Sequence, residues 1–117
     1  MTGGNGSRKD KGGSAPRRKG DAFEVKVVAD QERMGRVAFR ARQGGGEIVD
    51  VAVMEAFNPG QPYLRGSRTW LIQCRVGGHM TALEREQLIE RARVAGAEPQ
   101  MAFPNKRTIE YVEVKKP

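Results

Sequence analysis

The sequence predicts an α/β domain with one central mixed β-sheet and helices packed against it. Three observations support this prediction. The chain has 117 residues, the size of one domain, and 38% of them are apolar, which is enough for one small core. Segments with helical spacing of apolar residues occur beside segments with strand-like alternation. Their order is helix, three strands, helix and two strands, without an internal repeat.

The first 20 residues differ in composition from the rest of the chain. They contain six glycines, and no large apolar residue follows Met1. Six basic residues and one acidic residue give this segment most of the net charge of +7. Because it cannot bury enough surface to fold, we predict a disordered basic Gly-rich tail over residues 1–20 and a folded domain over residues 21–117. The tail either solubilises the chain or acts as a basic arm on nucleic-acid phosphates.

The first helix is predicted to begin at Asp21, which is a suitable N-cap residue. Phe23, Val27 and Met34 recur at close to helical spacing, which predicts one buried face. Gly35 follows Met34 and is expected to end the helix.

Three strands are predicted after this helix. Residues 36–41 alternate apolar and basic side chains, and residues 48–54 form a dense apolar run typical of a largely buried strand. The third strand spans residues 69–76, after a loop or hairpin rich in turn-forming residues. Its two faces carry Trp70, Ile72 and Cys74 on one side, and Leu71, Gln73 and Arg75 on the other.

The second helix begins with a capping box, in which Thr81 is followed three residues later by Glu84. Apolar residues then follow at helical spacing, and Gly96 is suited to the C′ position. Two closing strands are predicted at residues 98–103 and 108–114, with a turn at residues 104–105.

Composition excludes several classes of protein. No apolar run approaches the roughly 18 residues that span a bilayer, so we expect no membrane protein. The N-terminus lacks the apolar stretch of a secretory signal, so we expect a cytoplasmic protein. Cys74 and His79 are the single cysteine and the single histidine, which excludes a disulfide scaffold and a Cys-rich zinc site. The positive net charge favours a nucleic-acid partner.

Four polar residues are candidates for chemistry. Asp50 lies within an apolar run, where a carboxylate is costly to desolvate without a partner or a metal. Gln73 and Arg75 share one face of the third strand, and oxygens from Asp50 and Gln73 suit a hard cation such as Mg²⁺. Glu24, in the first turn of the first helix, offers a second carboxylate.

Each of these residues also has a structural interpretation. Asp50 could bond only to the backbone or to an arginine, as structural ion pairs do. Gln73 and Arg75 could form the solvated face of an antiparallel strand. Glu24 could simply interact favourably with the helix dipole.

The order of these motifs resembles a known family. The stretch Lys19-Gly20-Asp21-Ala22-Phe23-Glu24 begins the first helix, a glycine-rich turn precedes Asp50, and Trp70-Leu71-Ile72-Gln73-Cys74-Arg75 precedes a capped helix and two strands. This pattern, over residues 19–114, resembles the PD-(D/E)XK nuclease superfamily. Within it, the chain is most similar to the small archaeal-type Holliday-junction resolvases, of which phages carry compact versions. The resemblance implies a single restriction-endonuclease-like domain.

The resemblance also implies roles for the four residues. Glu24, Asp50 and Gln73 would hold Mg²⁺, with Mn²⁺ as the alternative, and these three with Arg75 would form the catalytic set. Gln73 stands in place of the motif's acidic residue, which leaves the site with one less negative charge. Arg75 stands in place of the motif's lysine; an arginine stays charged and cannot act as a base, but it can stabilise a phosphate.

The function that this implies is metal-dependent, structure-selective DNA cleavage. Such an enzyme would resolve four-way (Holliday) junctions by phosphodiester hydrolysis, as a homodimer in the cytoplasm, or in the host cytoplasm if the chain is phage-encoded. The alternatives are a non-catalytic, structure-specific DNA-binding protein on a nuclease fold, or another nicking or repair endonuclease of the superfamily. The residues expected to contact DNA are Arg17, Arg18, Lys19, Arg40, Arg42, Tyr63, Arg65 and Arg68.

Overall fold

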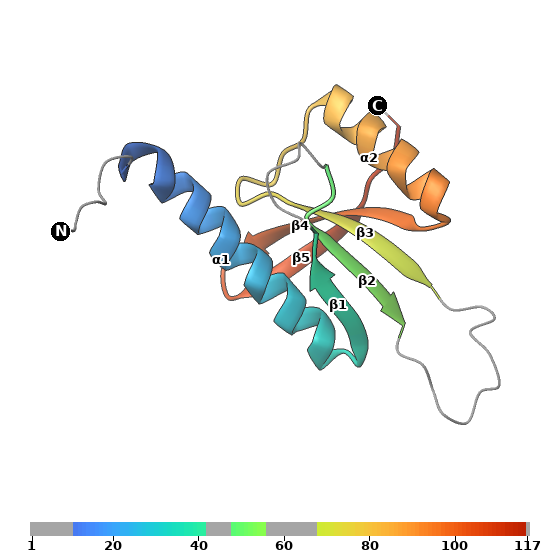
Figure 1. The fold of residues 1–117 in the computed structure, drawn as a ribbon, viewed down its shortest axis with the longest axis horizontal. Helices are drawn as coiled ribbons and strands as arrows, with labels where there is room; N and C mark the ends of the chain where they lie inside the picture. Colours follow the sequence, from blue (N-terminus) through green and yellow to red (C-terminus); the bar gives the residue numbers. More distant parts are fainter. Residues whose placement is uncertain (1–10, 42–47, 56–67, 117) are drawn as a thin grey trace.

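The structure is a computed structural model that describes residues 11–41, 48–55 and 68–116, with side chains from Gly20 onward. Two helices and five strands follow one another in the predicted order (Figure 1). They are α1 (Lys11–Arg33), β1 (Arg36–Arg40), β2 (Val51–Glu55), β3 (Thr69–Cys74), α2 (Ala82–Ala95), β4 (Glu98–Asn105) and β5 (Thr108–Glu113).

The five strands form one sheet in the order β1-β2-β3-β4-β5. Neighbouring strands are antiparallel, except that β3 and β4 are parallel. Parallel neighbours need a crossover connection, and α2 supplies it. The predicted α/β class with a central mixed sheet is therefore confirmed.

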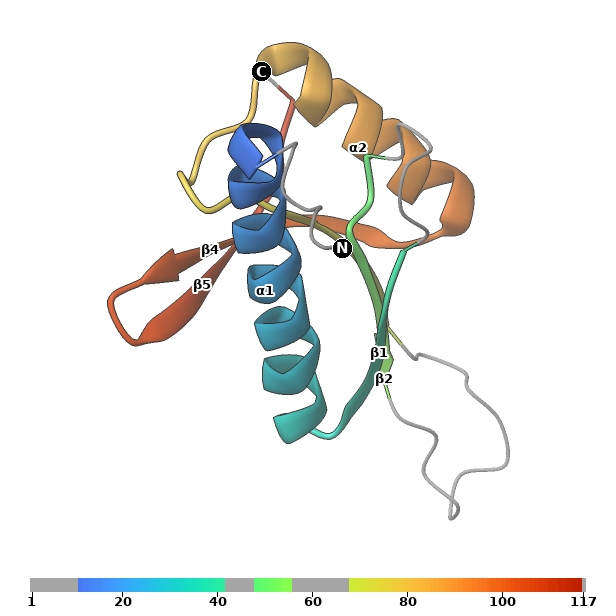
Figure 2. The ribbon, with the colours of Figure 1, turned by 60° about the vertical axis from the view of Figure 1, so that its left-hand side comes forward.

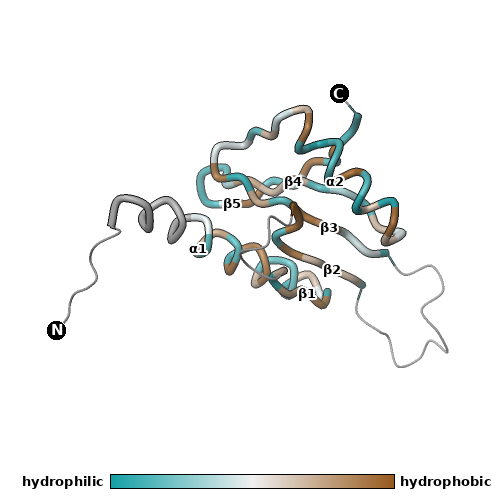
Figure 3. Tube along the Cα trace, turned by 45° about the horizontal axis from the view of Figure 1, so that its top comes forward, coloured by the Kyte–Doolittle hydropathy of each residue, from teal (hydrophilic) through white to brown (hydrophobic). Residues whose placement is uncertain are grey.

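Each helix covers its own part of the sheet, and the two make separate hydrophobic clusters. Figure 2 shows α1 lying between β1 and the β4–β5 hairpin, with α2 along the top of the view. In the tube of Figure 3, hydrophobic residues gather along β2 and β3, between the helices. The α1 cluster is built from Phe23, Val27, Ala38, Val51, Val53, Trp70, Ile72 and Ala102. The α2 cluster is built from Val49, Met80, Leu88 and Val114.

The predicted caps of α2 are confirmed. Thr81 Oγ1 accepts a hydrogen bond from the amide of Glu84 at 3.1 Å, and Glu84 Oε1 accepts one from the amide of Thr81 at 2.9 Å. Gly96 ends the helix in the left-handed conformation with φ of 67°, and its amide bonds back to the last turn. This geometry satisfies backbone groups that the helix ends leave unpaired.

The prediction that α1 begins at Asp21 is wrong, because the helix begins at Lys11. Asp21 lies inside the helix, and its carboxylate pairs with Arg40 at 3.0 Å instead of capping the first turn. Once packing holds one part of a helix, each added residue gains a hydrogen bond at low cost, so weak helix formers can extend it. Within the described residues, neither helix has both the length and the apolar character needed to cross a membrane.

Residues 11–20 of the predicted tail lie in α1, residues 1–10 lie outside the described part of the chain, and the division at residue 20 stays a prediction. The predicted end of the helix is close to the observed one. Gly35 follows α1 with φ of 85°, a conformation that glycine adopts at no steric cost.

Asp50 lies at a bend immediately before β2, and not in the middle of a strand as predicted. Val49 packs in the α2 cluster, whereas Val51 packs in the α1 cluster. In a regular strand, residues 49 and 51 would face the same side of the sheet, because side chains alternate between the two faces. Here they face opposite sides, so the alternation is interrupted at Asp50. The bend frees the Asp50 side chain from the regular alternation of the strand.

The predicted turn between the two closing strands is also corrected, and one aromatic residue of β1 is exposed. The β4–β5 turn falls at Lys106 and Arg107, because the two strands stay paired as far as Asn105 and Thr108. Phe39 of β1 is 49% exposed. It lies on the face of β1 away from α1, and α2 packs on β3 and β4 instead of covering this face.

Candidate active site

Three hydrogen bonds hold Asp50 in place, one to the residue that follows β1 and two to residues of β3. Its carbonyl accepts from the amide of Ala41 at 2.8 Å, and its amide donates to the carbonyl of Ile72 at 2.9 Å. Its side-chain Oδ2 accepts from the amide of Cys74 at 2.8 Å. The carboxylate is therefore held at the end of β3, by the residue that follows Gln73.

Glu24 is a buried carboxylate on α1 that is paired with an arginine. Its side chain is 10% exposed. Arg40 of β1 donates to Glu24 Oε1 from Nε at 3.0 Å and from Nη2 at 2.8 Å. Arg40 Nη2 also bonds to Asp21 at 3.0 Å. Arg40, predicted to contact DNA, is thus engaged by the carboxylates of α1, and its predicted role on DNA stays a prediction.

The Glu24 and Asp50 carboxylates influence each other. Burial raises the pKa of Asp50 to about 6, and the hydrogen bond from the amide of Cys74 opposes this rise. The charge of Glu24 and a side-chain hydrogen bond with it raise the pKa of Asp50 further, whereas the charge of Arg75 lowers it. A carboxylate whose pKa is raised by burial and by a neighbouring carboxylate is a common feature of hydrolytic sites.

Gln73 presents a buried oxygen that needs a partner. The residue is 7% exposed, and within the described residues its Oε1 has no hydrogen-bond partner. A buried acceptor left unpaired costs free energy comparable to a lost hydrogen bond. Gln73 precedes Cys74, whose amide holds the Asp50 carboxylate, and a hard divalent cation takes carboxylate and amide oxygens as ligands.

The donor set is mixed, not purely acidic. In the described part of the chain, no three His, Cys, Asp or Glu side chains come close enough to hold a metal. A site here would therefore combine the Asp50 carboxylate with the Gln73 amide. With one carboxylate and one neutral amide, such a site carries one less negative charge than a site with two carboxylates.

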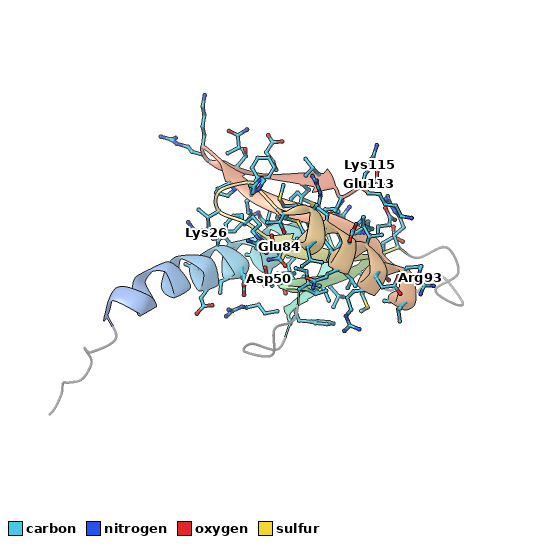
Figure 4. All side chains as sticks on the ribbon, turned by 90° about the horizontal axis from the view of Figure 1, so that it is seen from above. Lys26, Asp50, Glu84, Arg93, Glu113 and Lys115 are labelled. Atoms are coloured by element: carbon cyan, nitrogen blue, oxygen red, sulfur yellow. The ribbon has the colours of Figure 1, made fainter. Side chains whose placement is uncertain are left out.

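Arg75 connects the end of β3 to the start of α2. It forms an ion pair with Glu84, the same residue that completes the capping box of α2. The hydrogen bond from the amide of Thr81 makes the largest contribution to the lowered pKa of Glu84, and Arg75 lowers this pKa further. Figure 4 shows Glu84 and Asp50 in the central part of the molecule. The capping motif located Glu84 in the sequence, but nothing in the sequence indicated that it pairs with Arg75.

Cys74 is a small residue at the edge of the core, on the same face of β3 as Trp70 and Ile72, as the strand pattern predicts. It is half-buried and packs against the α1 cluster. Burial raises the pKa of its thiol, and the charges of Asp50 and Glu24 act in the same direction. The thiol therefore stays protonated at neutral pH and is a poor nucleophile.

The other predicted DNA contacts lie apart from this cluster or outside the described residues. Arg68 is exposed and bonds to both carboxylate oxygens of Glu98, at 2.7 and 2.6 Å. Its guanidinium also lies 4.9 Å from the centre of the Trp70 ring. The side chains of Arg17, Arg18 and Lys19 and the whole of Arg42, Tyr63 and Arg65 lie outside the description.

The fold is that of a single restriction-endonuclease-like domain, with a five-stranded mixed sheet and a helix on either side. Among solved structures, the chain is similar to Hjc, a Holliday junction resolvase from the archaeal hyperthermophile Archaeoglobus fulgidus. The TM-score is 0.60 at 23% sequence identity, over 81% of this chain and 77% of that chain. No protein-family model matches the sequence. No curated protein sequence matches it either.

Proposed function

We propose that the protein is a divalent-metal-dependent endonuclease that cleaves branched DNA. The observation that carries the proposal is a fixed carboxylate bonded to the residue that follows a buried, unsatisfied oxygen. Asp50 is hydrogen-bonded to the amide of Cys74, and the preceding residue, Gln73, has a buried Oε1 without a partner in the described structure. The likeness of the fold to a solved Holliday junction resolvase supports this interpretation.

Asp50 and Gln73 would hold the metal, with Mg²⁺ as the expected ion and Mn²⁺ as its substitute. A metal bound there would supply an activated water molecule for attack on a phosphodiester. Glu24 would assist from α1, because its charge and hydrogen bond add to the rise in the pKa of Asp50 that burial causes. Arg75 would stabilise negative charge on the phosphate, since a guanidinium suits phosphate oxygens but cannot accept a proton.

A four-way junction is the substrate that we propose within this class. Resolution of a junction requires cuts in two opposed strands, and one chain offers one such site. We therefore propose a homodimer that places two sites on one branched DNA. Substrate geometry is set by how the two copies are arranged, so a nicking or repair enzyme of the same fold is the nearest alternative.

A second candidate function rests on the environment of Arg75. Its guanidinium pairs with Glu84, and its Nε is buried without a hydrogen-bond partner in the described structure. An arginine held in this way has no role as a general base. A protein that keeps the fold and binds branched DNA without cutting it would have this arrangement.

One experiment separates the two functions. A labelled four-way junction and a linear duplex of matched sequence are incubated with the protein in Mg²⁺, in Mn²⁺ and in chelator. Paired, metal-dependent cuts in the junction, abolished by Asp50→Asn, are the expected result. Asparagine keeps an acceptor for the Cys74 amide but removes the charge, so loss of cleavage with retained binding assigns the role to the carboxylate. Tight junction binding with no cuts in either metal would establish the binding protein instead.

A further inference from the structure

A groove of about 640 Å³ runs between α1 and the β4–β5 hairpin, away from Arg40 and β1. One wall is a stripe of α1 at residues 23, 26, 30 and 33, a spacing that places the four side chains along one helix face. The other wall is the end of the hairpin (Figure 2). The charged residues of its lining are Lys26, Asp30, Arg33, Lys106 and Arg107.

The groove carries an excess of positive charge. Four of these five residues are basic, and all four are exposed. Asp30, the acidic one, already bonds to Arg33 at 2.7 Å and accepts from the Tyr111 hydroxyl at 2.7 Å. Glu110 of β5 alternates with Ile109 and Tyr111, which face α1, so it lies on the opposite face of the hairpin. Opposed cationic walls of this kind suit a polyanion.

The hairpin turn places charge at the groove at a conformational cost. Lys106 and Arg107 form a two-residue loop between Asn105 and Thr108. Lys106 has φ of 58°, and within the described residues it is the only residue other than glycine with positive φ. Glycine is favoured where the first residue of such a loop has positive φ. A lysine there gives up backbone stability and contributes a cation to the groove.

We propose that this groove binds the phosphate backbone of a second duplex arm of branched DNA. The inference rests on the proposed function and deepens it. Glu24 lies on the side of α1 that faces β1, and Lys26 lies on the side that faces the hairpin. A DNA arm at the carboxylates and an arm in the groove would therefore pass on two sides of the same helix. Such an arrangement favours a junction over a linear duplex.

The test removes the charge without harming the turn. Lys106→Gly/Arg107→Ser replaces two cations with residues that suit the loop, so its Tm should equal or exceed that of the parent. Lys26→Gln/Arg33→Gln removes two cations from the opposite wall. Arg91→Gln/Arg93→Gln on α2 is the charge-matched control, and Figure 4 shows Arg93 far from Lys26. Binding to a labelled junction and to a duplex is measured in chelator, so that no cleavage occurs.

Both groove variants should bind the junction more weakly than the control variant does. The slope of log K against log salt should fall by about 2, since each lost phosphate contact contributes about 0.9. The ratio of the parent's junction-binding constant to that of either variant should then change about tenfold between ~50 and ~200 mM salt. Affinity for the duplex should fall less, so the preference for the junction narrows.

Two results would overturn the inference while leaving the proposed function intact. In the first, the parent cuts junctions, and both groove variants bind junctions as tightly as the parent does. The groove would then not bind DNA, and an acidic protein segment would be the remaining candidate for its occupant. In the other, the α2 control loses as much affinity as the groove variants, which would show a general effect of net charge. A parent that neither binds nor cuts the junction would instead overturn the proposed function, and this inference with it.

Discussion

Arg40 donates two hydrogen bonds to a single oxygen, Oε1 of Glu24, from Nε at 3.0 Å and Nη2 at 2.8 Å. This pair joins the edge strand β1 to α1 beside Asp50. It compensates a carboxylate whose side chain is only 10% exposed. The candidate site is therefore coupled to the packing of α1 on the sheet, and changes to Arg40 should affect both stability and the site.

Arg40→Met should lower the free energy of unfolding by about 2 kcal/mol, because it leaves the Glu24 carboxylate buried without its main partner. Arg40→Lys keeps the charge but cannot make the two bonds, and should cost less. Urea denaturation of both variants at neutral pH measures the difference. Equal stability of Arg40→Met and the parent would show that water or another group compensates Glu24.

Gln73→Glu should increase Mg²⁺ affinity, on the order of tenfold, because it adds a negative oxygen ligand on the residue before Cys74, whose amide holds Asp50. Isothermal titration with Mg²⁺ alone measures the change. Gln31→Glu is a matched control, since Gln31 is also a buried glutamine but bonds to Arg36 at 2.7 Å. An increase of the same size in both variants would mean that the effect is one of net charge and not of a ligand.

The pKa of Asp50 predicts a pH dependence of stability. Its pKa is raised from 3.8 to about 6 in the folded protein, mainly by burial. Between these two values the folded state binds more protons than the unfolded state, so stability falls as pH rises from about 4 to about 6. The contribution should be about 1 to 2 kcal/mol after allowance for partial solvent screening.

Asp50→Asn isolates this contribution. Urea unfolding of the parent and of Asp50→Asn across the same pH range should show the fall only in the parent, because asparagine does not titrate. Metal binding should have the opposite dependence, since it needs the ionised carboxylate and should strengthen as pH rises through about 6. Parallel stability curves for the two proteins would place the titration elsewhere.

Arg75→Lys tests whether the arginine limits catalysis. A lysine at this position could lose and gain a proton, which the guanidinium cannot do. If cleavage occurs, the variant should cut the junction at least about tenfold faster, a gain at the low end of what a positioned proton-transfer group supplies. The readout is single-turnover cleavage, with Arg85→Lys as the control for the same exchange on α2. No gain from Arg75→Lys would place the rate limit in the metal site.

Some features of this protein are encoded locally, and the sequence alone determined them. The capping box at Thr81 and Glu84 and the terminal Gly96 make hydrogen bonds within a few residues, so their spacing predicts the bounds of α2. Alternation of apolar residues likewise placed Trp70 and Ile72 on a buried face of β3. The order of these elements was enough to predict a mixed sheet.

Other features depend on which elements become neighbours, and only the tertiary structure decided them. Glu24 and Arg40 lie 16 residues apart and meet because α1 packs on β1. The bend at Asp50 results from bonds to two strands at once, and a sequence pattern with a period of two residues does not reveal it. Lys26 and Lys106 are far apart in the sequence but line the same groove. They do so because the crossover through α2 places the β4–β5 hairpin beside α1. Local spacing carries no information about such pairings, since they follow from sheet order and helix packing.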